Sequence, residues 1–159
     1  MIGTPIINAS LNQLDYLIME GGLNDMYGSY PIGNPIVGYD AWVDLSSPTT
    51  FYESLEYMIG NVVTNLYRTK TCFIIMPKRN RTNWNEQYVP AIKNVCDKWS
   101  VLYVDLNNIF STRLNAMQNT PISKDFWSFY SNDGRWNEHP SNWGYKQIND
   151  KIFSLMDIL

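Results

Sequence analysis

Asn24 and His139 are the two residues of this sequence with the clearest potential for chemistry. Asn24 follows an apolar run, 16–19, and the glycines Gly21 and Gly22. If the run is a strand buried on both faces of a parallel sheet, the glycines permit a sharp turn just beyond it. The turn presents the Asn24 amide and the neighbouring backbone N–H groups at the sheet edge where open α/β sheets bind ligands. His139 is the only histidine and titrates near neutral pH.

The elements that position these residues are predicted from hydrophobic periodicity. Thr50 and Glu53 have the spacing of a capping box, which predicts a helix over 50–67. Asn83 with Glu86 is predicted to cap a second helix, whose inward stripe is Tyr88, Ile92, Val95, Cys96 and Trp99. Strands are predicted at 71–76 and 101–106, short helices at 4–14 and 107–117, and an aromatic-rich irregular segment at 121–135. The last helix, 142–159, is expected to turn Tyr145, Ile148, Ile152, Leu155 and Leu159 inward.

The order strand, helix, strand, helix, strand, helix predicts an α/β fold, a parallel sheet with helices packed on both faces. With 159 residues, 45% of them hydrophobic, the chain is expected to form a single domain over 1–159. The net charge of −3 with interspersed signs gives no footprint for nucleic acid or an anionic membrane. Neither a signal peptide nor a membrane-spanning run is recognisable, so we expect a soluble protein. One histidine and two separated cysteines do not make a usual zinc set, and no cofactor is expected.

Two blocks of this pattern resemble the SGNH (GDSL-like) hydrolase family over nearly the whole chain. Gly22-Leu23-Asn24-Asp25 is similar to the family's Gly-x-Asn-Asp block at the end of a strand. The segment from Asp133 to His139-Pro140, followed by Gly144-Tyr145, is similar to its last block. The resemblance implies a three-layer, flavodoxin-like α/β/α architecture. It also implies that the Asn24 amide and the Gly22 backbone N–H bind the oxyanion of a tetrahedral intermediate, and that His139 is the general base.

The match departs from the family in two places. The triad acid usually stands three residues before the histidine, and Trp136 occupies that position here. Asp133 becomes the acid if residues 135–138 form an insertion; otherwise a backbone carbonyl orients the ring. The Gly-Asp-Ser block that carries the nucleophile is not found, and Ser10 and Ser29 are poor substitutes.

The missing block has a structural consequence. In the family's strand order, the nucleophile strand pairs with the strand at 15–20, so that strand would have an open edge. We therefore expect the N-terminal strand of the fold to come from an upstream segment of a longer polypeptide, or another chain to cover the edge. A truncated domain that uses the fold for binding is the alternative.

The expected function is ester hydrolysis, with O-deacetylation of a carbohydrate as one form of it. The long loop 26–48 and the aromatic segment 126–136 are predicted to flank the site, with Tyr27, Tyr30, Trp42 and Trp136 as substrate-binding residues for an acyl ester or an acylated glycan. The basic loop after the second strand, which contains Lys78, is expected to be solvated. The rival interpretation is a catalytically silent carbohydrate-binding or assembly module, such as part of a cell-surface or virus-tail protein.

Overall fold

The computed structural model describes residues 14–40, 45, 47–76, 82–108, 127–129 and 136–156. For residues 127–129, 136–139, 155 and 156 it describes the backbone alone. The chain divides into two compact units: the first combines Met1–Ile75 with Arg81–Val104, and the second combines Met76–Asn80 with Asp105–Leu159. Each unit is described by itself. The single domain over 1–159 stays a prediction.

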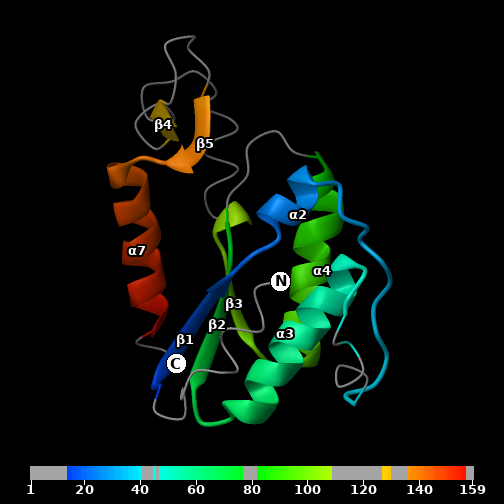
Figure 1. Ribbon diagram of the computed structural model, residues 1–159. Helices are drawn as coiled ribbons and strands as arrows, with labels where there is room; N and C mark the ends of the chain where they lie inside the picture. Colours follow the sequence, from blue (N-terminus) through cyan, green and yellow to red (C-terminus); the bar gives the residue numbers. More distant parts are fainter. Residues whose placement is uncertain are drawn as a thin grey trace. The chain divides into compact units, whose positions relative to one another are not determined.

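A parallel sheet forms the centre of the first unit (Figure 1). Its strands are β1 (Tyr16–Glu20), β2 (Lys70–Ile75) and β3 (Leu102–Asp105), in the order β1-β2-β3. β1 and β2 run parallel in a register that pairs Tyr16 with Lys70 and Glu20 with Ile74. The predicted α/β fold with a parallel sheet is confirmed.

The prediction that β1 is buried on both faces is wrong. Within β1 only Met19 is buried, whereas Tyr16 and Ile18 keep 41% and 42% of their surface exposed. Leu17 and Met19 alternate with them and pack on the hydrophobic core. In the described sheet β1 is the edge strand, so it has one neighbouring strand instead of two. An unbroken apolar run in the sequence shows neither that the strand lies at the edge of the sheet nor that some of its side chains are exposed.

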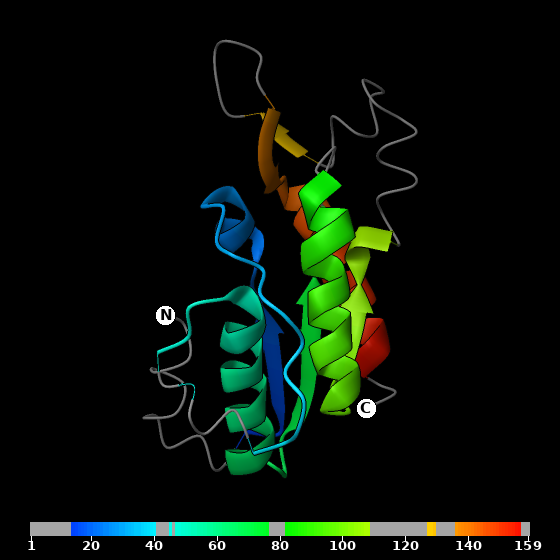
Figure 2. The ribbon, with the colours of Figure 1, turned by 90° about the vertical axis from the view of Figure 1, so that its right-hand side faces the viewer.

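Two helices cover the same face of the sheet, as Figures 1 and 2 show from two directions. They are α3 (Phe51–Asn65) and α4 (Val89–Lys98), and α4 continues from a π-helical turn, η2 (Trp84–Tyr88). Their inward side chains and those of β1 and β2 make one core, whose fully buried members include Ile59, Phe73, Ile75, Trp84, Ile92 and Val95. The predicted inward stripe of the second helix is confirmed, with Tyr88, Ile92, Val95 and Cys96 buried and Trp99 partly buried.

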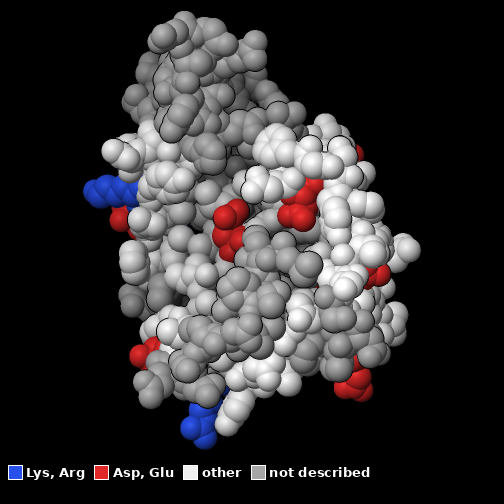
Figure 3. Space-filling model, in the orientation of Figure 1, with Lys and Arg blue, Asp and Glu red and all other residues white. Residues whose placement is uncertain are grey.

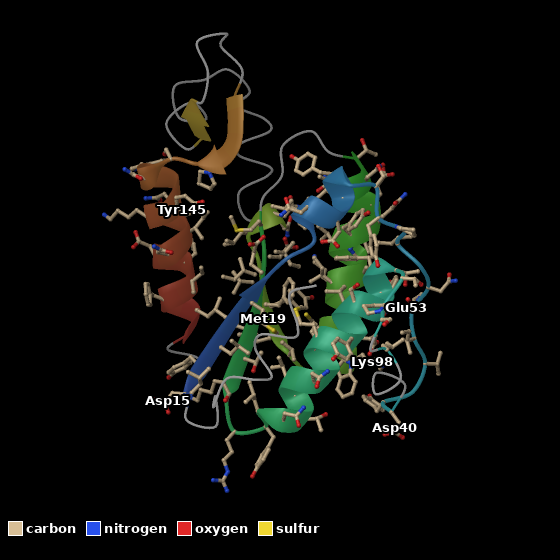
Figure 4. The ribbon with its side chains drawn as sticks, viewed as in Figure 1. Asp15, Met19, Asp40, Glu53, Lys98 and Tyr145 are labelled. Atoms are coloured by element: carbon tan, nitrogen blue, oxygen red, sulfur yellow. The ribbon has the colours of Figure 1, made fainter. Side chains whose placement is uncertain are left out.

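The amino ends of these two helices differ. α3 begins with the predicted capping box: Glu53 N–H donates to Thr50 Oγ1 at 3.3 Å, and Thr50 N–H donates to Glu53 Oε2 at 3.0 Å (Glu53 is labelled in Figure 4). The predicted cap at Asn83 is wrong. Asn83 itself has helical backbone angles and its side chain makes no capping bond. Helical backbone already begins at residue 82, so Asn83 lies inside the first turn.

The second unit contains a short hairpin and a helix. β4 (Trp127–Phe129) pairs antiparallel with β5 (Trp136–Pro140). β4 lies within the segment 121–135, which was expected to be irregular. α7 (Asn142–Met156) follows, and Ser141 Oγ accepts a hydrogen bond from Gly144 N–H at its start. Ile148 and Ile152 are buried as predicted, but Tyr145 (labelled in Figure 4) is 46% exposed, so its inward placement is wrong. The predicted helices at 4–14 and 107–117 lie almost wholly outside the described residues.

Candidate functional site

The turn after β1 is built around Gly22. This residue has φ +97°, a left-handed conformation that favours glycine, and it directly precedes the short helix α2 (Leu23–Tyr27). Its surroundings also exclude a side chain, because a Cβ there would lie 2.8 Å from Phe51 Cζ and 3.3 Å from Trp84 Cζ3. Gly21 has open space around its Cβ position. Of the two glycines that sequence analysis singled out, Gly22 is therefore the one that the turn requires.

A cavity of about 510 Å³ opens beside this turn. It is lined by the carboxyl end of β1, α2, Tyr30, Pro48 and one face of α3. Its lining residues, all in the first unit, are Glu20, Gly21, Gly22, Asn24, Asp25, Tyr30, Pro48, Phe51, Ser54, Leu55, Tyr57 and Met58. Glu20, Asn24 and Asp25 thus form a polar corner of the cavity, and the α3 residues form a largely apolar wall. The predicted location, at the carboxyl end of the first strand, agrees with the place of this cavity.

Asn24 contributes a polar side chain to this corner of the cavity. It is solvent-exposed and lines the cavity, and its side-chain amide makes no hydrogen bond within the described parts of the chain. Its backbone carbonyl accepts a 2.8 Å bond from Gly28 N–H, which closes the turn after α2. The alternative in which the Asn24 side chain bonds its own backbone is not what the structure shows. The amide is available to a ligand.

Two carboxylates accompany Asn24. Glu20 ends β1 and Asp25 is the third residue of α2. Loss of hydration raises the pKa of the Glu20 carboxyl above its ordinary value, although the side chain remains open to solvent. The pKa of the Tyr88 hydroxyl is also raised, first by burial and then by the negative charge of Asp25. The corner is therefore acidic.

Tyr88 holds the turn and the following segment together. Its hydroxyl donates to the Tyr30 carbonyl at 2.6 Å and lies 3.4 Å from the Asp25 carbonyl. Tyr30 in turn donates its own hydroxyl to the Pro48 carbonyl at 2.8 Å. Both Tyr30 and Pro48 line the cavity. The rim of the cavity is thus fixed by hydrogen bonds from η2 and across the predicted loop.

A buried ion pair fixes the next part of that loop. Glu56 of α3 is 1% exposed, and its carboxylate accepts bonds from Lys98 Nζ at 2.8 Å and from Trp99 Nε1 at 2.7 Å. Lys98, labelled in Figure 4, also donates to the Ile36 carbonyl at 3.0 Å. One ammonium group therefore joins α3, α4 and the segment 31–40. The Tyr39 ring lies edge-on to Trp99 beside them, with centroids 5.3 Å apart.

The predicted site residues have different outcomes. Asn24, Gly22 and Tyr30 line the same cavity. Tyr27 is 44% exposed at the end of α2 and is not among the lining residues. Trp42 and Asp133 lie outside the described residues, as do Ser10 and Lys78. Their assigned roles stay predictions.

His139 and Trp136 both belong to β5, of which the backbone is described. Trp127 of β4 pairs with Pro140, and Phe129 pairs with Trp136. Between these two pairs β4 advances by two residues and β5 by four, so β5 carries two extra residues. His139 lies in that irregular stretch. Bulges of this kind redirect side chains and are common next to active sites.

Sequence analysis missed the wall of the cavity. Phe51, Ser54, Leu55 and Met58 line it from α3, at the spacing i, i+3, i+4 and i+7 that defines one helix face. Helical periodicity in the sequence contains this signal, but a core stripe has the same spacing. Glu20, at the end of the predicted strand, was also missed.

Comparisons with solved structures identify the fold. The chain resembles a crystal structure of a Lactobacillus plantarum protein with a TM-score of 0.69 and 20% identity, over 98% of this chain and 72% of that one. A protein assigned as a GDSL-like lipase from Bacteroides ovatus matches with a TM-score of 0.60 and 18% identity, and one from Bacteroides uniformis with 0.59 and 16%. The fold is similar to that of GDSL-like hydrolases. The match covers 94% and 91% of this chain but only 58% and 53% of those two chains.

Other comparisons and searches of the described part of the chain gave no further assignment. No protein-family model matches the sequence, and no curated protein matches it significantly. Within the described residues, no helix is long and apolar enough to cross a membrane. Nor do the described His, Cys, Asp and Glu residues include a group of three or more that would hold a metal ion.

Proposed function

We propose that this chain provides the oxyanion-binding and proton-transfer groups of a serine-type ester hydrolase. The observation that carries the proposal is the cavity at the carboxyl end of β1, lined by Asn24 and Gly22, in a fold similar to GDSL-like hydrolases. Attack on an ester places negative charge on the carbonyl oxygen. The Asn24 amide and the Gly22 backbone N–H are donors for that charge, and a preorganised donor contributes about 2.7–4 kcal/mol.

In this proposal His139 is the general base. It takes the proton of a serine hydroxyl as the oxygen attacks the ester, and returns the proton to the departing alcohol. Water then repeats the attack on the acyl-enzyme. Asp133 holds the imidazole in the required orientation. The two extra residues in β5 support this assignment, because they account for two of the three residues by which the spacing from Asp133 to His139 exceeds the usual three.

The nucleophilic serine is proposed to come from a segment outside this chain that lies along β1. Support comes from β1 itself, which pairs with β2 alone in the described sheet and exposes Tyr16 and Ile18. Natural proteins rarely leave such an edge uncovered. Size-exclusion chromatography and intact mass of the natural product test this. A monomeric species of 18.5 kDa without a partner would contradict it.

The proposed substrates are acyl esters, with acylated glycans as one class. The aromatic residues Tyr27, Tyr30, Trp42 and Trp136 are the proposed contacts to the sugar, since aromatic faces pack well on apolar ring surfaces. These assignments rest on residue type and on the position of Tyr30 in the cavity lining.

The activity is tested by measuring hydrolysis of nitrophenyl acetate by this chain and by the natural polypeptide that contains it. In that natural polypeptide, Asn24→Ala is expected to lower kcat by about a hundredfold to a thousandfold. His139→Ala should lower it by at least about a hundredfold. Lys146→Ala, on the exposed surface of α7, is the control. Unchanged hydrolysis in the His139 variant would refute the assignment of His139 as the general base. A product that binds glycans without any hydrolysis would support the silent carbohydrate-binding module instead.

A further inference from the structure

The wall of the cavity is largely apolar on its α3 side, where Ser54 and Tyr57 are its polar members. Phe51, Leu55 and Met58 stand at successive turns of the helix, and Pro48 faces the cavity from the loop. Phe51 and Leu55 are buried in the core, whereas Met58 is half-buried and packs at the margin of the core. A volume of about 510 Å³ lies within the range of about 300–1,000 Å³ that is typical of ligand pockets. An acetyl group would leave most of it unfilled.

The charged side chains that line the cavity within the described residues all have one sign. They are those of Glu20 and Asp25, and no Lys or Arg is among the described lining residues. Acidic side chains are also visible in the central part of the face drawn in Figure 3. A ligand that carries a carboxylate or phosphate in this cavity would meet like charge from Glu20 and Asp25, and the described lining residues offer no cation to compensate it. Juxtaposed like charges are a strong source of discrimination against a partner.

We propose that this cavity binds the uncharged, apolar acyl chain of an ester, with the carbonyl at the Asn24 end and the chain along Phe51, Leu55 and Met58. The cavity then selects acyl groups longer than acetyl and rejects those that end in an anion. Met58 limits the length of chain that fits, because it is the wall residue that the core does not enclose. This inference rests on the proposed ester hydrolysis for the identity of the ligand, but the binding itself is measurable without turnover.

Methyl ketones are suitable probes, since they present a carbonyl and an alkyl chain and are not hydrolysed. Binding of butanone, 2-hexanone and 2-octanone is followed by NMR of the chain with isotope-labelled methionine methyl groups. The Met58 signal, assigned with Met58→Leu, is expected to shift, and that of the core residue Met26 to shift less. Affinity is expected to rise about fourfold for each methylene group that enters the cavity. Octanoate, whose carboxylate would face Glu20 and Asp25, should bind more weakly than 2-octanone.

Two variants test the location. Met58→Trp fills the cavity and is expected to weaken 2-octanone binding at least about tenfold, as expected when several methylenes lose their site. Thr64→Trp, an exposed position further along α3 that does not line the cavity, is the matched control. Glu20→Gln should strengthen octanoate binding and leave 2-octanone binding unchanged.

The wild-type chain alone already decides the proposal. Equal affinity for butanone and 2-octanone, an unmoved Met58 signal, or octanoate binding as tight as 2-octanone would each overturn it. Chain-length-dependent binding, together with no ester hydrolysis by the natural polypeptide that contains this chain, would uphold the cavity assignment and contradict the proposed function. Ester hydrolysis without chain-length-dependent binding would support the proposed function and contradict the cavity assignment.

Discussion

Replacing Gly22 with alanine should destabilise the first unit strongly, whereas the same change at Gly21 should not. A non-glycine residue at φ +97° is strained by about 1–2 kcal/mol. The new methyl group would also lie 2.8 Å from Phe51 Cζ, closer than real Cβ contacts come, and 3.1 Å from Phe51 Cε2, which is tighter than most of them. Phe51 is 2% exposed and cannot move away without disturbing the core. Overpacking of this kind costs about 1–3 kcal/mol.

Together these terms predict a loss of about 2–5 kcal/mol in the free energy of unfolding for Gly22→Ala. Gly21→Ala is the matched control, because its Cβ meets nothing within 4 Å and its φ is not in the left-handed region. Its effect should stay within about 0.5 kcal/mol.

Urea denaturation followed by tryptophan fluorescence measures both variants. The midpoint should fall for Gly22→Ala with the slope unchanged. Equal stability of the two variants would refute the argument, since it would mean that the turn accepts a side chain at Gly22.

The remaining predictions concern α3, the buried ion pair and the thiols. Thr50→Ala should lower the stability by about 1 kcal/mol through loss of the helix cap, measured by urea denaturation. Hydrogen bonds from Thr49 first, and then from Thr50, lower the pKa of the Glu53 carboxyl below 4.5. The stability that Glu53 contributes is therefore complete above that pH and should be lost as the pH falls through the lowered pKa. Glu53→Gln should flatten the acid side of a plot of the free energy of unfolding against pH. Lys98→Met should cost about 3–5 kcal/mol by leaving the Glu56 carboxylate buried without its cation, and adding Glu56→Gln should recover part of that loss in a double-mutant cycle. Burial raises the pKa of Cys96 to about 12, so this thiol should react with a disulfide reagent at neutral pH only after denaturation; rapid reaction of the native chain would contradict its burial.

Local signals were the most successful part of the sequence interpretation. The capping box at Thr50 and Glu53 placed the start of α3 correctly because its hydrogen bonds involve neighbouring residues only. The turn at Gly22 was predicted for the same reason: a glycine pair after an apolar run marks a change of chain direction. Asn83 shows the limit of this approach, since a good capping residue type does not cap when the helix begins before it.

Properties that depend on distant neighbours were predicted less well. The apolar run of β1 suggested burial on both faces, but exposure of Tyr16 and Ile18 depends on which strands pair with β1. Pairing of β4 with β5 was missed because neither segment alternates clearly between apolar and polar residues. The α3 wall of the cavity has the same periodicity as a core stripe. Only the structure shows that Met58 borders a cavity.

The contacts of Lys98 have a consequence for any redesign of the loop 26–48. The ammonium group of Lys98 is bonded to Glu56 and to the Ile36 carbonyl, so the conformation of the loop is coupled both to α3, which follows it directly, and to α4, which is remote from it in sequence. A loop transplanted from another protein would need a carbonyl at the position of Ile36, or the lysine would lose one acceptor inside the protein. The loop cannot therefore be exchanged alone: the loop, Lys98 and Glu56 would have to be transferred together.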